Sequence, residues 1–194
     1  MNNPRKTSIA LSYNGKNVNS KITELLESFT YTDVASGQTD TLAIVLSEHK
    51  HKWISDWFPV EEDYLKANIS VKNWNKMNDN RTLKCGKFLI DDFSFSGPGD
   101  LYHLNAISSP IDTDFSSTEK SKTWNKTSIK SIATKIAKSA KLKLHFDAKD
   151  YKIDKLEQSG QSDMNFIFNL CNDYNLAMKL YDSKLVIFDE IKYE

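Results

Sequence analysis

The stretch from Gln158 to Phe188 contains signals for the start, the apolar face and the end of one helix. Ser162 and Asp163 are typical of a helix start, because a short side-chain oxygen can accept a hydrogen bond from the first turn. Asn175 is suited to a left-handed position just after the helix. The apolar positions recur at helical spacing and comprise Met164, Phe166, Ile167, Leu170, Cys171 and Tyr174.

The same stretch continues into a predicted hairpin. Residues 177–181 and 184–188 alternate like strands on either side of the turn Asp182-Ser183. A helix and a hairpin with apolar faces form a small packed module, and we expect Phe166 and Leu170 to lie in its core. No reactive group of side chains is found in this module.

The preceding part of the chain, residues 7 to about 110, is predicted to be mainly β. Its strands are expected at residues 7–13, in the stretch 22–35, and at 41–46, 65–74, 82–95 and 101–107. Six or more antiparallel strands at this spacing favour a barrel or a sandwich, and closure into a barrel would remove the exposed strand edges. Residues 51–58 have helical spacing before Pro59, which indicates a short inserted helix.

A polar run from Asp112 to Lys122 has little periodicity and is typical of a linker. A helix capped by Thr127 or Ser128 is expected to follow, with strands at 142–146 and 151–156. The predicted fold class is therefore α+β: an N-terminal antiparallel β-barrel at 1–112 with the inserted helix, then a small α/β module at 118–194.

The charge of the chain is balanced overall, with 26 basic and 26 acidic residues, but its distribution is uneven. Eight lysines and no acidic residue lie between Lys120 and Lys143. Four of these lysines lie on the surface of the predicted helix: Lys130, Lys135, Lys138 and Lys141. They form a candidate protein-contact surface, although a solvated face or a nucleic-acid contact would have the same pattern.

Nucleic-acid binding by these lysines is disfavoured because exposed aromatic residues are lacking between them. Trp124 is the exception, and we expect it to pack as a hydrophobic staple.

Other candidate sites have weaker patterns. Glu48, His49, His51 and Asp56 form a cluster without the spacing of a metal site, and the consecutive acids at 61–63 suit an exposed turn. Asp91 and Asp92 are consecutive in a strand, so one is expected to point inward. The two cysteines, Cys85 and Cys171, are expected to be buried and reduced. No cofactor, metal or enzymatic activity is expected. The first 20 residues lack the apolar stretch of a signal peptide, so none is expected, and no apolar run near 18 residues suggests a membrane span.

Four blocks of the sequence, in order, resemble one protein family. They are residues 28–48 (SFTYTDVASGQTDTLAIVLSE), 84–97 (KCGKFLIDDFSFSG), 121–144 (SKTWNKTSIKSIATKIAKSAKLKL) and the Gln-Ser-x-x-Ser-Asp block that begins at Gln158. The family is that of the baseplate hub proteins of contractile phage tails, which includes the late control D proteins. It extends to the hub proteins of prophages and of phage-tail-like bacteriocins, and more distantly to type VI secretion spike proteins.

The resemblance implies that the N-terminal domain is like a tail-tube subunit. It also implies a structural role in which a trimeric hub joins the hexameric tail tube to the trimeric spike, within a virion or tail-like particle assembled in the bacterial cytoplasm. The implied partners are the tail tube protein, the spike protein, other baseplate proteins and further copies of the hub. Members of the family have a second β-barrel, which this chain is expected to lack. The alternative function is a cell-wall or carbohydrate-binding module, in which Trp74, Tyr102 and Trp124 would stack on sugars.

Overall fold

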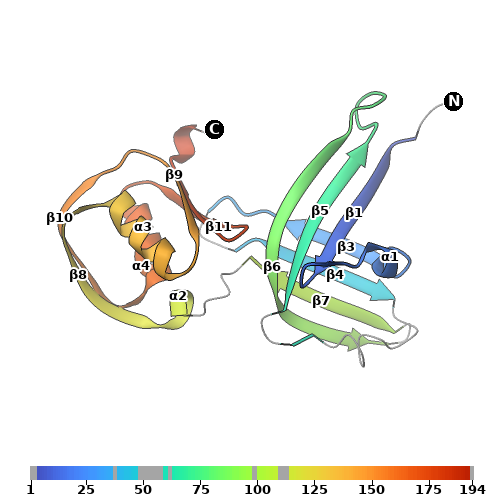
Figure 1. Cartoon of the computed structure of the whole chain (residues 1–194), viewed down its shortest axis with the longest axis horizontal. Coiled ribbons are helices and arrows are strands. Elements are labelled where there is room, and N and C mark those ends of the chain that lie inside the picture. Colours follow the sequence, from blue (N-terminus) through green and yellow to red (C-terminus); the bar gives the residue numbers. More distant parts are fainter. Residues whose placement is uncertain are drawn as a thin grey trace. The chain divides into compact units, whose positions relative to one another are not determined.

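The computed structural model describes residues 4–36, 39–47, 59–60, 63–97, 100–108 and 114–192. The chain divides into two compact units (Figure 1). Unit 1 comprises residues 1–33 and 40–108, and unit 2 comprises residues 34–39 and 109–194. The short segment 34–39 belongs to unit 2 although it lies between two strands of unit 1 in the sequence.

Unit 1 is built on one antiparallel sheet. Its strands are β1 (Lys6–Tyr13), β2 (Lys16–Asn17), β3 (Leu26–Thr32), β4 (Thr41–Ser47), β5 (Tyr64–Lys72), β6 (Arg81–Ser96) and β7 (Leu101–Ile107), with the short helix α1 (Asn19–Ile22) between β2 and β3. The strand order is β2-β1-β5-β6-β7-β4-β3. Alternation determines which face is buried: Leu42, Ile44 and Leu46 of β4 are each about 1% exposed, while the residues between them are more accessible.

The sheet of unit 1 has two ends. Among the described residues, no pairing joins β1 or β2 to β3, so the closed barrel expected from the sequence is not confirmed. The predicted helix at residues 51–58 lies outside the described residues. The sequence did not predict α1, since a single turn has no detectable periodicity. Asp91 and Asp92 are both exposed, because a bulge between Ile90 and Asp92 interrupts the alternation.

Unit 2 combines helices with two small sheets. Its elements are α2 (Asp114–Ser117), β8 (Glu119–Ser128), α3 (Ile129–Ser139), β9 (Lys143–Asp147), β10 (Lys152–Ser162), α4 (Asp163–Asp173), β11 (Ala177–Tyr181), β12 (Lys184–Phe188) and the 3₁₀ turn η1 (Glu190–Lys192). Strands β8 and β10 form an antiparallel ribbon, and β9 pairs in parallel with β12 beside β11. Helices α3 and α4 lie inside the curve of these strands (Figure 1). Helices, ribbon and sheet all contribute side chains to one apolar core.

The predicted helix starts and turns of unit 2 are confirmed. The hydroxyl of Ser162 accepts a hydrogen bond from the Asn165 N–H at 3.3 Å, and Ser128 caps α3 in the same way. Asn175 follows α4 in the left-handed region, at φ 53°. Asp182 and Ser183 both have positive φ, as a tight hairpin turn requires. Phe166 and Leu170 are buried in the core as expected.

The predicted linker at 112–122 is wrong from Asp114 onward, where α2 and the beginning of β8 lie. The reason is that β8 is exposed over most of its length, so its sequence is polar despite its pairing with β10. Trp124 lies within β8 and stacks on Phe166, with ring centroids 6.2 Å apart, so it is not a hydrophobic staple. No helix within the described ranges is both long and apolar enough to span a membrane.

Candidate protein-contact surfaces

The lysines of α3 lie on its solvent face. Ile129, Ile132, Ala133, Ile136 and Ala137 fill the inward face of this helix and are nearly inaccessible. Lys130, Lys135 and Lys138 are exposed, as is Lys141, which follows the helix. The separation of apolar and charged faces follows from the helical spacing of the sequence. The four candidate residues are therefore brought to the outside of one element.

Two lysines gather over one buried aromatic ring. The ammonium of Lys122, on β8, lies 4.0 Å from the ring centroid of Trp124, and that of Lys135 lies 5.7 Å from it. Cation–π attraction favours these positions. Trp124 itself is only 4% exposed because Phe166 covers its other side. The surface therefore presents ammonium groups above a ring that is covered, so stacking of a base or a sugar on this ring is not possible in this conformation.

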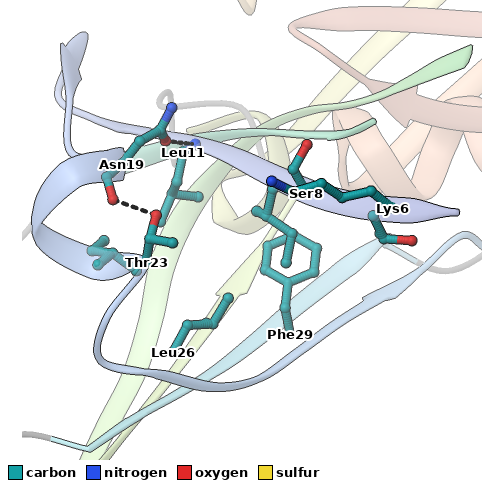
Figure 2. A pocket seen from close by; sticks show the side chains of 10 residues that line it. Lys6, Ser8, Leu11, Asn19, Thr23, Leu26 and Phe29 are labelled. Carbon is teal, nitrogen blue, oxygen red and sulfur yellow. Dashed lines mark hydrogen bonds between the residues drawn. The ribbon is translucent and has the colours of Figure 1, made fainter. Parts of the chain in front are cut away.

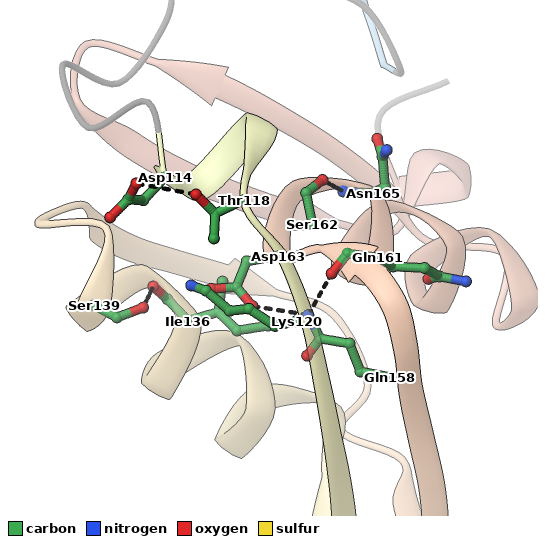
Figure 3. Close-up of polar contacts among 10 residues, drawn as sticks. All are labelled: Asp114, Thr118, Lys120, Ile136, Ser139, Gln158, Gln161, Ser162, Asp163 and Asn165. Atoms are coloured by element: carbon green, nitrogen blue, oxygen red, sulfur yellow. Dashed lines mark hydrogen bonds and ion pairs between the residues drawn. The ribbon is translucent and has the colours of Figure 1, made fainter.

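A buried polar cluster lies where β10 meets α4 (Figure 3). The Asp163 carboxylate accepts hydrogen bonds from the Lys120 ammonium at 2.5 Å and from the Gln158 amide at 3.0 Å. The Gln158 amide also donates to the carbonyl of Gln161 at 3.0 Å. Gly160 lies in the bulge of β10 between Gln158 and Gln161 and has φ +54°, a backbone conformation that glycine adopts easily. Gln158 and Asp163 of the Gln-Ser-x-x-Ser-Asp block thus link β10 and α4 to Lys120 of β8 through hydrogen bonds inside unit 2.

A second buried carboxylate is found in unit 1, and the sequence did not predict it. Asp63 is 7% exposed and accepts hydrogen bonds from the Tyr13 hydroxyl, the Asn14 amide and the Val60 N–H. Burial alone would raise the pKa of Asp63, but these three hydrogen bonds outweigh it and hold the pKa below its usual value. The exposed turn expected at residues 61–63 is therefore wrong for Asp63. Two of its three partners, Tyr13 of β1 and Asn14 of the turn after it, lie about fifty residues away in sequence, so the consecutive acids gave no signal of this contact.

The open end of the sheet in unit 1 contains an apolar pocket of about 280 Å³. Its walls come from β1, α1 and the start of β3 (Figure 2). Ile9 and Leu11 of β1 line one side, and Leu26 and Phe29 of β3 line the other. Phe29 points toward β1 in this view, while Asn19 of α1 and Thr23, which follows this helix, lie at one end. The pocket is therefore located where a closed barrel would have its last strand pairing.

No catalytic or metal-binding arrangement is found in the part of the chain that the structure describes. No three His, Cys, Asp or Glu side chains there lie close enough to hold a metal ion. The cluster predicted from Glu48, His49, His51 and Asp56 lies outside the described residues. Both cysteines are buried and free, as expected, and burial raises the pKa of Cys171 to about 12. A thiol with this pKa is a weak nucleophile near neutral pH.

Comparison with known proteins gives matches through structure alone. No protein-family profile and no curated protein sequence matches the chain. Among solved structures, a tail protein of Neisseria meningitidis MC58 superimposes with a TM-score of 0.64 at 11% identity, covering 93% of this chain and 50% of that one. The 43 kDa tail protein of prophage MuSo2 from Shewanella oneidensis has a TM-score of 0.59 at 11% identity over 94% and 53%. Both matches extend over unit 1 and unit 2.

This chain has the fold of phage tail proteins. Prophage tail protein gp18 of Listeria monocytogenes EGD-e is a further structure of this kind, with a TM-score of 0.58 at 12% identity over 95% of this chain and 51% of that one. The chain spans about half the length of these phage tail proteins. The family suggested by the four sequence blocks is thus supported at the level of fold.

Proposed function

We propose that this chain is a structural component of the baseplate hub of a contractile phage tail or a phage-tail-like particle. The observation that carries the proposal is the extent of the match: phage tail proteins superimpose on both units, over more than nine tenths of the chain. In this role the tail-tube-like unit 1 contributes to a ring that joins the hexameric tube to the trimeric spike. The proposal covers both an infectious phage and a phage-tail-like bacteriocin.

Unit 2 offers the lysine surface for contact with an acidic partner in the baseplate. Lys130, Lys135 and Lys138 extend from a rigid helix whose inward face is fully packed, so their backbone positions are fixed. Clustered cations of one sign accelerate and orient the association with an oppositely charged surface. Their contribution is expected to weaken as salt concentration rises.

The carbohydrate-binding alternative is not favoured by the positions of its aromatic residues. Tyr102 and Trp124 are 0% and 4% exposed, and only Trp74 of the three has an accessible ring, at 46%. A single exposed ring does not form a sugar-binding platform. A pull-down with purified peptidoglycan distinguishes the two functions, and retention of the chain on peptidoglycan would favour the alternative.

The hub proposal is tested by assembly of the chain with tail tube and spike proteins from the same source. We expect gel filtration with light scattering to detect a complex containing three copies of the chain, and electron microscopy to show it at the end of the tube. The triple variant Lys130→Glu, Lys135→Glu, Lys138→Glu is expected to weaken the complex. The matched control changes the same charge in unit 1, at exposed Lys16, Lys66 and Lys76. A chain that binds neither tube nor spike protein would contradict the hub role.

A further inference from the structure

The free edge of β1 has backbone groups that point away from the sheet. The Leu11 N–H donates to the Asn19 side chain at 2.5 Å, and the Leu11 carbonyl accepts from the Val18 N–H at 3.1 Å. Both partners lie on the side of β1 opposite to β5. Because backbone direction alternates along a strand, the N–H and C=O groups of Thr7 and Ile9 point to this same side. Among the described residues the structure shows no partner for them.

The apolar pocket described above lies beside these backbone groups. Ile9, Leu11, Ile22, Leu26 and Phe29 provide its apolar lining. At about 280 Å³ it is larger than the ~150 Å³ cavity that accommodates a benzene-sized ligand. An extended segment that pairs with Thr7 and Ile9 would direct every second side chain into this pocket. The alternate residues of the segment would lie beside exposed Ser8 and Lys6.

The positive charge at the β1 edge indicates which residue the bound segment should carry there. Lys6 lies directly opposite Lys72 of β5, and both side chains are exposed. Like charges at directly opposite positions of a sheet repel one another. An acidic residue beside Lys6 would offset this repulsion.

We propose that the β1 edge of unit 1 binds an extended segment of another protein by strand addition, in which apolar residues alternate with polar ones and an acidic residue faces Lys6. Backbone pairing supplies affinity and the pocket selects the alternate side chains, as in other cases of strand addition. Pairing also covers a strand edge that is otherwise open to aggregation. The proposal does not depend on the hub role, since it rests on the edge and pocket alone.

The probe is a fluorescent ten-residue peptide that alternates valine with threonine and carries a glutamate at each end. We expect saturable binding by fluorescence anisotropy, and no binding of the same peptide with every amide N-methylated. Amide exchange measured by NMR identifies the site. Thr7 and Ile9 should become protected when the peptide binds, whereas Ser8 and Ala10, which pair with β5, are already protected.

The decisive variant is Thr7→Pro, which removes one edge N–H without removing a hydrogen bond to β5. We expect about a tenfold loss of affinity, the effect of one lost hydrogen bond, with Ser8 and Ala10 still protected. Thr7→Val keeps the N–H and should bind within about twofold of the original chain. Lys6→Glu should weaken binding of the glutamate peptide and strengthen binding of a peptide with terminal lysines.

Three outcomes would overturn the proposal. The first is the absence of peptide binding at millimolar concentration, and the second is binding without added protection of Thr7 and Ile9. The third is protection of these two amides by the chain alone at high concentration, which would assign the edge to a second copy. Loss of binding to tube and spike proteins does not affect this test, so failure of the hub role is distinguishable from failure of strand addition.

Discussion

Unit 1 and unit 2 bury their apolar residues in different ways. Unit 2 surrounds α3 and α4 with strands, so its core receives side chains from several elements of the unit. Within the residues that the structure describes, unit 1 relies on a single sheet whose two ends are not paired with each other, and an apolar pocket lies at the open end. A core that is covered on all sides contributes to stability, while an open sheet edge leaves backbone and apolar groups available for contacts. Unit 2 is therefore expected to be the more stable unit, and unit 1 carries the edge proposed for strand addition.

The largest expected effect tests the core of unit 2. Replacement of Phe166 by alanine removes the ring that stacks on Trp124 and should cost about 3–5 kcal/mol of unfolding free energy. Denaturant unfolding followed by tryptophan fluorescence measures this change, and amide exchange shows which unit is affected. Asn169→Ala, at an exposed position of the same helix, is the control and should change little. Equal loss of protection in β4 and β7 would show that the two units do not unfold separately.

The second largest expected effect is a pH-dependent loss of stability in unit 1. Asp63→Asn weakens three hydrogen bonds of a buried carboxylate and should cost about 1–3 kcal/mol at neutral pH. Since the pKa of Asp63 is lower in the folded chain than in the unfolded chain, its contribution is complete above the unfolded pKa. This contribution of Asp63 to the free energy of unfolding is lost as the pH falls through the pKa that Asp63 has in the folded chain.

The measurement is the unfolding free energy of both proteins from pH 7 to pH 2. The difference between the original chain and Asp63→Asn should shrink in the acidic range. Asp91→Asn, an exposed position on β6, provides the control. A difference that stays constant down to pH 2 would mean that ionisation of Asp63 does not stabilise unit 1.

The sequence predicted local features better than long-range ones. Residues 177–181 and 184–188 form strands with the predicted bounds, because alternation and a two-residue turn are encoded within a dozen residues. Strand β8 was missed because only one of its ten residues is buried, so no alternation marks it. The open sheet and the placement of 34–39 in unit 2 depend on contacts between distant parts of the chain.

The same difference between local and long-range features decides which of the candidate surfaces could be predicted from the sequence. The lysine face of α3 was predictable, since helical spacing alone separates Lys130, Lys135 and Lys138 from the buried positions. The pocket of unit 1 was not predictable, because it requires β1, α1 and β3 to meet in space. The buried state of Asp63 was missed for the same physical reason: its partners Tyr13 and Asn14 lie about fifty residues away in sequence.

A smaller effect is expected at a glycine of unit 2. Gly160 has φ +54°, and a Cβ there would lie 3.9 Å from the Glu119 carboxylate, which is an ordinary contact. The cost of Gly160→Ala is therefore the backbone strain, about 1–2 kcal/mol, and thermal unfolding measures it. Gly97→Ala in unit 1 is the matched control. Its φ lies outside the left-handed region, and no described atom beyond its chain neighbours would lie within 4 Å of the added Cβ. A penalty at Gly97 equal to that at Gly160 would contradict the backbone explanation.

The smallest effect is expected on the exposed ribbon of unit 2. Lys155 and Glu157 form an ion pair of 2.7 Å, and their side chains are 65% and 59% exposed. Water and salt screen such a pair, and ordering two long side chains offsets most of the attraction. Lys155→Ala should therefore leave the Tm unchanged at physiological ionic strength, as should Glu157→Gln and the double variant. A double-mutant cycle measures their coupling, which should vanish at high salt. Coupling that persists in 1 M salt would mean that the ribbon is more shielded from solvent than its exposed side chains indicate. Unit 2 would then not divide into a covered core and a solvent-exposed ribbon.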